Sequence, residues 1–264
     1  MLTDLMLMLS PANLIVFVLV MARLSGMIAS APFFSTIPAP FQAKAILVFL
    51  TGFIMYPMVA NTMTSAIFSG VIDMPALIVL ITKEVIIGAI IGFCANIIFI
   101  GVQMAGHILA MQMGLSISDV LDPLTQQNVP VLGQFYMFVA SLTFLFINGH
   151  IWLFSSIYNS YKIIPINYDF IFTGPLVERI VYFSSQIFHI AFELIVPIYA
   201  VLIITAMVLG FMSKALPRMN VFMVALPVKI FIGLALICMF TMQSSTFLAG
   251  LMETLLKNID NMFL

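Results

Sequence analysis

The stretch that decides the fold is VIIGAIIGFCANIIFIGVQMAGHILAMQMGLSIS, Val85 to Ser118, which contains no Asp, Glu, Lys or Arg. A membrane-spanning helix needs about 20 apolar residues, and this stretch is longer than that. Of the 264 residues, 63% are hydrophobic and only 7% are charged, whereas soluble proteins carry about 25% charged residues. The sequence therefore excludes a water-soluble domain and predicts an all-α membrane protein.

Further apolar segments lie on both sides of this stretch, and charged residues mark most of their ends. The six segments are Leu5–Ala22, Ala45–Ile72, Val85–Ser118, Pro123–Tyr161, Ile180–Ser213 and Ile230–Met252. The last could begin earlier, because residues 221–228 are also apolar. We therefore expect about six hydrophobic helical segments in one integral membrane domain that covers residues 1–264.

Prolines interrupt these segments. Three of them fall between Ala31 and Pro40, which a regular helix cannot accommodate. Pro197, Pro217 and Pro227 predict further kinks or turns. Irregular backbone at membrane depth is tolerated only where protein or a water-filled cavity covers it. The sequence thus predicts Pro/Gly-broken hairpins that pack against other protein.

The composition also argues against several functional classes. The net charge is −1, so there is no basic excess for binding nucleic acid. Cys94 and Cys238 form neither a disulfide framework nor a CxxC metal pair. The sequence contains no HExxH, GxSxG, GxxxxGK[ST] or GxGxxG motif. We expect no catalytic residue, no metal site and no cofactor.

Several polar residues of the late segments are candidates for contacts between subunits. His189 and Glu193 are four residues apart, so they share one face of a helix. They could form half of a metal site, a proton relay, or a polar contact with a neighbouring helix or subunit. Ionisable groups inside a membrane are functional candidates by default. Together with Lys214 and Arg218, we predict that they pair across subunit contacts.

Small residues recur at helical spacing in the central stretch. Gly88 and Gly92 form a GxxxG motif, and Gly106, Ala110 and Gly114 place a small residue at every fourth position. Such faces let helix backbones approach closely in lipid. We expect Gly88, Gly92, Gly106 and Ala110 to be helix-packing positions.

The end of this stretch has a composition suited to a deformable seal. Met111 and Met113 are flexible side chains, and Gly114 follows them with the freedom of glycine. After Gly114, apolar residues alternate with polar ones in Leu115, Ser116, Ile117, Ser118, Asp119, Val120, Leu121, Asp122 and Pro123. The pattern predicts that Met111–Pro123 forms part of a closed gate, although a solvated connecting turn is the alternative.

Taken together, the motifs resemble the FliR family of flagellar type III export-gate proteins, whose injectisome relatives are called SctT. The resembling passages are Ala22–Gly26, Ala31–Phe34, Lys83–Glu84 before Gly88, Gln112–Ser116, Asp122–Pro123, Phe144–His150, Ser160–Tyr161 with Pro165, Leu216–Phe222 and Leu226–Lys229. They extend from the first segment to the last. Specificity comes from the whole set of passages, since each one alone is weak.

The resemblance implies a subunit of a helical hetero-oligomeric export gate in the bacterial inner membrane, within the flagellar basal body. Its implied partners are homologues of FliP, FliQ and FlhB, membrane lipid, and the unfolded flagellar proteins that pass through. Residues 1–175 would be similar to FliP, 176–250 would form a FliQ-like helix pair, and 251–264 would be a short polar tail. The family's pore plug falls at Met111–Pro123.

Two other functional classes remain open from the residues alone. A small-molecule or ion-coupled secondary transporter would require a midplane site of convergent polar groups and two repeat halves, and no repeat is visible. A proton-linked intramembrane enzyme would require a paired nucleophile and base, and no such pair is evident in the sequence.

Overall fold

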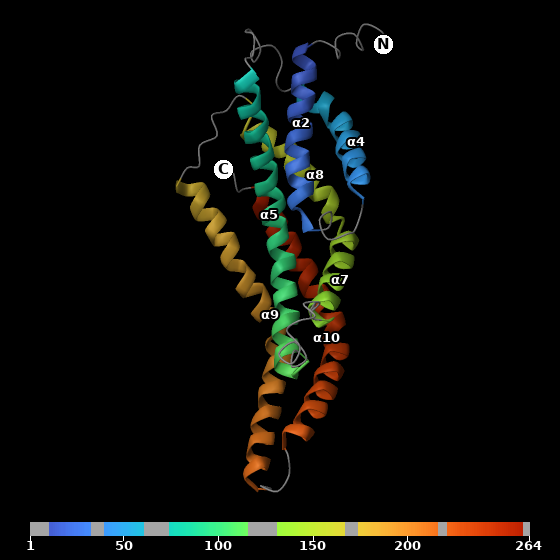
Figure 1. The fold of residues 1–264 in the computed structure, drawn as a ribbon, viewed down its shortest axis with the longest axis vertical. Helices are drawn as coiled ribbons and strands as arrows, with labels where there is room; N and C mark the ends of the chain where they lie inside the picture. Colours follow the sequence, from blue (N-terminus) through green and yellow to red (C-terminus); the bar gives the residue numbers. More distant parts are fainter. Residues whose placement is uncertain are drawn as a thin grey trace. The chain divides into compact units, whose positions relative to one another are not determined.

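The computed structural model describes residues 11–32, 40–60, 74–115, 131–166, 174–215 and 221–260, whose regular structure is entirely helical (Figure 1). The helices are α2 (Pro11–Ser30), α4 (Phe41–Ala60), α5 (Met74–Met113), α7 (Val131–Phe146), α8 (Gly149–Ile163), α9 (Gly174–Ala215) and α10 (Val221–Asp260). Among the described residues, five helices are long and apolar enough to cross a membrane, namely α2, α4, α5, α9 and α10. Helices α7 and α8 together could form a sixth span, which is bent between them. The prediction of an all-α membrane protein with about six hydrophobic segments is confirmed.

Several helix ends differ from the prediction: α4 begins at Phe41, α9 begins at Gly174 and α10 ends at Asp260, all beyond the predicted segments. Two further ends differ for a shared reason. The first segment was expected to end at Ala22 and the third to begin at Val85, because charged residues follow and precede them. Instead α2 continues to Ser30 and α5 begins at Met74. The charges that marked these ends are buried and paired with each other, so they lie inside helices. At the last segment, α10 begins at Val221, the earlier of the two starts that the sequence allows.

The helices break at one place that the sequence did not predict, and two predicted breaks are absent. Between α7 and α8, Asn148 has a φ of 57°, in the left-handed region that asparagine tolerates better than most residues. This residue separates the two helices of the broken span. Pro197 and Pro227 lie inside α9 and α10, so neither produces the turn that was one of the expectations. Residues 33–39 and Pro217 lie outside the described residues.

The contacts within the chain divide it into two compact units. The first comprises Met1–Asn96, Asn148–Tyr182 and Glu253–Leu264. In it, α4 packs on α2, and the ring of Phe17 meets Phe49 and Tyr56 edge-on at centroid distances of 5.8 and 6.0 Å. The core includes apolar side chains from α2, α4, α5 and α8, among them Leu19, Leu24, Met27, Val59, Ile87, Ile91, Leu153 and Ile157.

The second unit comprises Ile97–Ile147 and Phe183–Met252. The rings of Phe99 and Phe144 meet edge-on at a centroid distance of 5.5 Å, which fastens α7 to α5. A Cβ atom at residue 101 would lie 2.9 Å from Cβ of Ile190, so α9 also approaches α5 closely. By contrast, only 11% of the apolar window of α10 is buried. Most of this helix therefore requires lipid or another protein to cover it.

Candidate functional site

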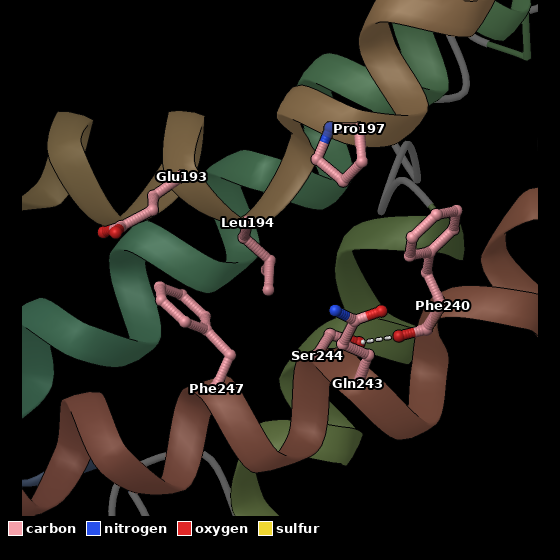
Figure 2. A pocket seen from close by; sticks show the side chains of 7 residues that line it. All are labelled: Glu193, Leu194, Pro197, Phe240, Gln243, Ser244 and Phe247. Carbon is pink, nitrogen blue, oxygen red and sulfur yellow. Dashed lines mark hydrogen bonds between the residues drawn. The ribbon is translucent and has the colours of Figure 1, made fainter.

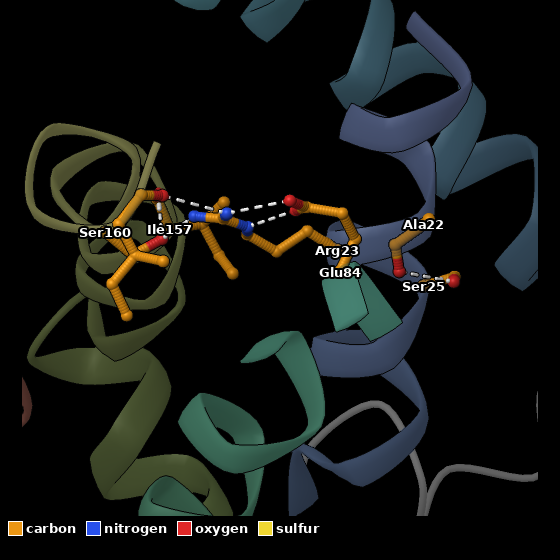
Figure 3. Close-up of polar contacts among 7 residues, drawn as sticks. Ala22, Arg23, Ser25, Glu84, Ile157 and Ser160 are labelled. Atoms are coloured by element: carbon orange, nitrogen blue, oxygen red, sulfur yellow. Dashed lines mark hydrogen bonds and ion pairs between the residues drawn. The ribbon is translucent and has the colours of Figure 1, made fainter. Parts of the chain in front are cut away.

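A buried ion pair joins α2 to α5 in the first unit (Figure 3). Arg23 Nε donates to Glu84 Oε2 at 2.6 Å, and Arg23 Nη2 donates to Glu84 Oε1 at 3.1 Å. This is the bidentate arrangement that matches a planar guanidinium to a carboxylate. The side chains are 0% and 3% exposed, and both lie in candidate membrane spans. Each charge therefore depends on the other for compensation.

The remaining contacts of Arg23 reach α8. Arg23 Nη1 donates to Ser160 Oγ at 2.8 Å, and Nη2 also donates to the carbonyl oxygen of Ile164 at 3.1 Å. The ring of Tyr161 lies 3.8 Å from Arg23 Cζ, within cation–π distance. A cation is favourable at a helix C-terminus, where carbonyl groups lack helical partners. Arg23 thus connects three helices through one side chain.

Sequence reasoning missed this cluster. Arg23 and Glu84 were read as the polar ends of apolar segments, and Ser160 and Tyr161 served only as family motifs. A usable signal was present, because residues 24–30 continue the apolar pattern beyond Arg23 and residues 74–82 precede Glu84 with little charge. Opposite charges inside two apolar helices favour pairing over exposure to lipid.

Glycines let α2 and α5 approach closely beside the ion pair. A Cβ atom at residue 88 would lie 2.8 Å from the carbonyl carbon of Arg23 and 3.0 Å from the backbone nitrogen of Met27. A Cβ atom at residue 92 would lie 2.6 Å from the carbonyl oxygen of Met27. Gly26 on α2 meets the backbone of Val85 in the same way. The backbones themselves are in contact, so these positions leave no room for a side chain.

The other predicted packing positions lie in the second unit. A Cβ atom at residue 106 would lie 2.6 Å from Cα of Gly133, so α5 and α7 approach each other backbone to backbone there. Ala110 is buried one turn further along α5.

The described part of the predicted gate is the end of α5. The N–H of Leu115 donates to the carbonyl oxygen of Ala110 at 2.9 Å, and the N–H of Gly114 donates to that of Met111 at 3.1 Å. Gly114 has a φ of 83°. These are the two hydrogen bonds and the left-handed residue of a Schellman motif. Gly114 therefore ends the helix.

The two methionines before Gly114 have different surroundings. Met113 is fully buried, and its Sδ and Cε atoms lie 2.6 Å from the place that a Cβ atom at residue 233 would take. Gly233 on α10 thus leaves the space that Met113 fills. Met111 is exposed. The remaining gate candidates, Ser116 to Pro123, lie outside the described residues.

The predicted polar pair is present on α9. His189 Nδ1 and Glu193 Oε2 are 3.1 Å apart, and the side chains are 65% and 45% exposed. Lys214 is exposed near the end of α9. At 1.5 Å per residue it is about 31 Å further along the helix than Glu193, so they do not pair within this chain. Arg218 lies outside the described residues. No group of three His, Cys, Asp or Glu residues that could hold a metal occurs in the described ranges.

A groove with a volume of about 210 Å³ lies between α9 and α10 in the second unit (Figure 2). Its lining residues are Glu193, Leu194 and Pro197 from α9, and Phe240, Gln243, Ser244 and Phe247 from α10. The Ser244 hydroxyl donates to the carbonyl oxygen of Phe240 at 2.8 Å. The groove combines one carboxylate, one amide and two aromatic rings.

Comparison with known proteins gives consistent matches. Residues 14–255 match the family model of bacterial export proteins, family 1. The flagellar biosynthetic protein FliR of Bacillus subtilis is 35% identical over 60% of this chain and 62% of its own length, so the match spans about three fifths of that relative. FliR of Escherichia coli is 27% identical over 81% of this chain and 79% of its own length. The surface presentation of antigens protein SpaR of Shigella flexneri is 27% identical over 70% of this chain and 73% of its own length.

Proposed function

Because the chain belongs to the bacterial export proteins of family 1, the family of the FliR proteins, we propose that it is a subunit of the flagellar type III protein export apparatus. The observation that carries this proposal is the family match over residues 14–255, which takes in every described helix except the first residues of α2 and the last residues of α10. The relatives named FliR support the flagellar branch over the injectisome branch.

We further propose that the chain forms the export gate together with homologues of FliP and FliQ, in the inner membrane of the basal body, and that a homologue of FlhB contacts it. Unfolded flagellar proteins would cross the membrane through this complex. Residues 1–175 would be the FliP-like part, residues 176–250 the FliQ-like helix pair, and residues 251–264 a polar tail. The exposed apolar surface of α9 and α10 supports this arrangement, since neighbouring subunits would cover it.

Within this complex, Met111–Pro123 is proposed to contribute to the closed gate. The described residues support this in one respect. The Schellman motif at Gly114 ends α5 sharply, and buried Met113 anchors the last turn of the helix. The loop that follows would therefore start from a fixed position at the end of α5. An apolar constriction can exclude water and ions while it is closed.

Deletion of the gene tests the proposed function. The deletion strain should be non-motile and should secrete no filament protein, and the wild-type gene should restore both. The chain should also purify in a large complex with FliP and FliQ homologues, and should aggregate when it is expressed alone. A motile deletion strain would refute the proposal. A stable monomer that does not bind the FliP and FliQ homologues would also refute it. Substrate uptake by that monomer in proteoliposomes would favour a secondary transporter.

Deletion of Ser116–Val120 tests the gate. If the complex assembles with this deletion, the membrane should leak ions or small solutes. Wild-type conductance in an assembled complex would exclude this loop as the gate.

A further inference from the structure

The groove between α9 and α10 presents polar groups in an apolar setting. Glu193 lies near the middle of the apolar window of α9, which spans Val177–Ala215, and Gln243 lies near the middle of the window of α10, Met223–Leu255. A charged or amide side chain at such a depth is unfavourable unless a partner satisfies it. The groove is thus a place where a polar partner would be stabilised.

The groups in this groove have unused hydrogen-bonding capacity. An ionised carboxylate has about four lone-pair sites, and the contact of Glu193 in the described part of the chain is the one with His189. Gln243 is exposed, and its amide makes no hydrogen bond within the described residues. The Phe247 ring extends from α10 toward Glu193 and Leu194 on α9 (Figure 2).

A groove lined by a carboxylate and aromatic rings is chemically suited to one type of ligand. The carboxylate attracts a cation, and an aromatic ring face attracts it through its quadrupole. An anion would be repelled by Glu193, and an apolar side chain would add no partner to the single contact that Glu193 makes with His189. Charge complementarity therefore selects a cationic occupant.

We propose that this groove receives the side chain of a lysine or arginine carried by a membrane helix of another chain. The pair would form between Glu193 and the incoming cation, on the side of the groove where the Phe247 ring lies (Figure 2). This inference rests on the proposed function only in requiring a neighbouring membrane chain in the export complex. In this proposal Glu193 makes the contact with the other chain in the groove. Lys214 does not take part, because it lies too far along α9.

Photo-crosslinking in cells that express all export genes tests this proposal. The photoreactive residue p-benzoylphenylalanine replaces Phe240, so an aromatic ring is kept at the groove, and a second strain carries it at exposed Phe211, outside the groove. Mass spectrometry identifies the cross-linked peptide. We expect, from position 240 only, a peptide of a different membrane chain with a Lys or Arg within about one helical turn of the attachment site, a rise of about 5.4 Å.

Two further variants test the charge. Glu193→Gln should lower the yield of the cross-link about tenfold, whereas Glu253→Gln at an exposed site on α10 should leave it unchanged. Glu193→Lys should abolish the cross-link, and replacing the basic residue of the partner with Glu should restore it. If Glu193→Gln prevents assembly, this reversed pair still decides the question.

Several results would overturn the inference. These are attachment to lipid, to a second copy of this chain, to this chain's own residues, or to a helix without a nearby basic residue. An unchanged yield in Glu193→Gln, or failure of the reversed pair to restore the cross-link, would do the same. Size-exclusion chromatography of the solubilised complex separates the two proposals. A complex with FliP and FliQ homologues but no such cross-link refutes the groove alone, and absence of any complex refutes the proposed function as well.

Discussion

Removing one member of the Arg23–Glu84 pair should destabilise the protein strongly, and removing both should not. In Arg23→Met, Glu84 loses both of its hydrogen bonds from the guanidinium, and its side chain is only 3% exposed. The cost of leaving a buried charge without its partner is about 3–5 kcal/mol. That is a large part of the roughly 5–15 kcal/mol that stabilises a typical native protein.

The double variant Arg23→Met with Glu84→Met removes both charges. Replacing a buried ion pair with apolar residues of similar volume is often neutral or stabilising. Here the gain is incomplete, because Arg23 also donates to the carbonyl oxygen of Ile164 and to Ser160. A buried acceptor left without its donor costs about 1–3 kcal/mol. We therefore expect the double variant to be more stable than either single variant and slightly less stable than the wild type.

Thermal melting of a fluorescently tagged chain, followed by size-exclusion chromatography of detergent-solubilised membranes, measures this order. The cells should also express the partner proteins, so that assembly does not limit the signal. The matched control is Glu253→Met, at an exposed position of α10, which should change the melting temperature little. If the losses in the two single variants simply add in the double variant, the pair is not the energetic unit described above.

Four glycines give further predictions. Gly88→Ala should reduce stability by about 1–3 kcal/mol through overpacking against the α2 backbone, whereas Gly210→Ala, which meets no atom within 4 Å, should be neutral or stabilising in the same melting assay. Gly114→Ala should cost about 1–2 kcal/mol because its φ of 83° is left-handed, and an unchanged melting temperature would contradict the helix-end role. Gly233→Ala and Met113→Ala should be non-additive in a double-mutant cycle, since the new methyl group fills space that Met113 leaves; additive losses would exclude that contact.

The number and type of the helices could be predicted from the sequence because apolar length is a direct physical requirement of the bilayer. The helix ends could not be predicted in the same way, because a charged residue was taken to end an apolar segment. This criterion failed at Arg23 and Glu84, where the folded chain satisfies the charges internally. A contact between residues 61 positions apart in the chain is invisible to any rule that reads one segment at a time.

The candidate sites were predictable to different degrees. The proximity of His189 and Glu193 follows from their spacing of four on one helix. The groove beside them does not follow, because Gln243 and Phe247 come from another helix and their register against α9 is a tertiary property. The sequence predicts that Gly114 makes the gate flexible, whereas the hydrogen bonds of Gly114 and Leu115 show that this glycine ends α5. The residue type was informative, but its role depended on the two carbonyl groups that precede it.

A combination of two sequence patterns would have located the buried cluster. Gly26 follows Arg23 by three residues and Gly88 follows Glu84 by four, so in each helix the charge and the glycine share one face. Glycines mark the face along which membrane helices approach each other. A charge on that face points toward the neighbouring helix and away from lipid. The close backbone contact and the ion pair are therefore parts of one arrangement: the glycines bring α2 and α5 near enough for the bidentate contact, and the opposite charges select this face for pairing.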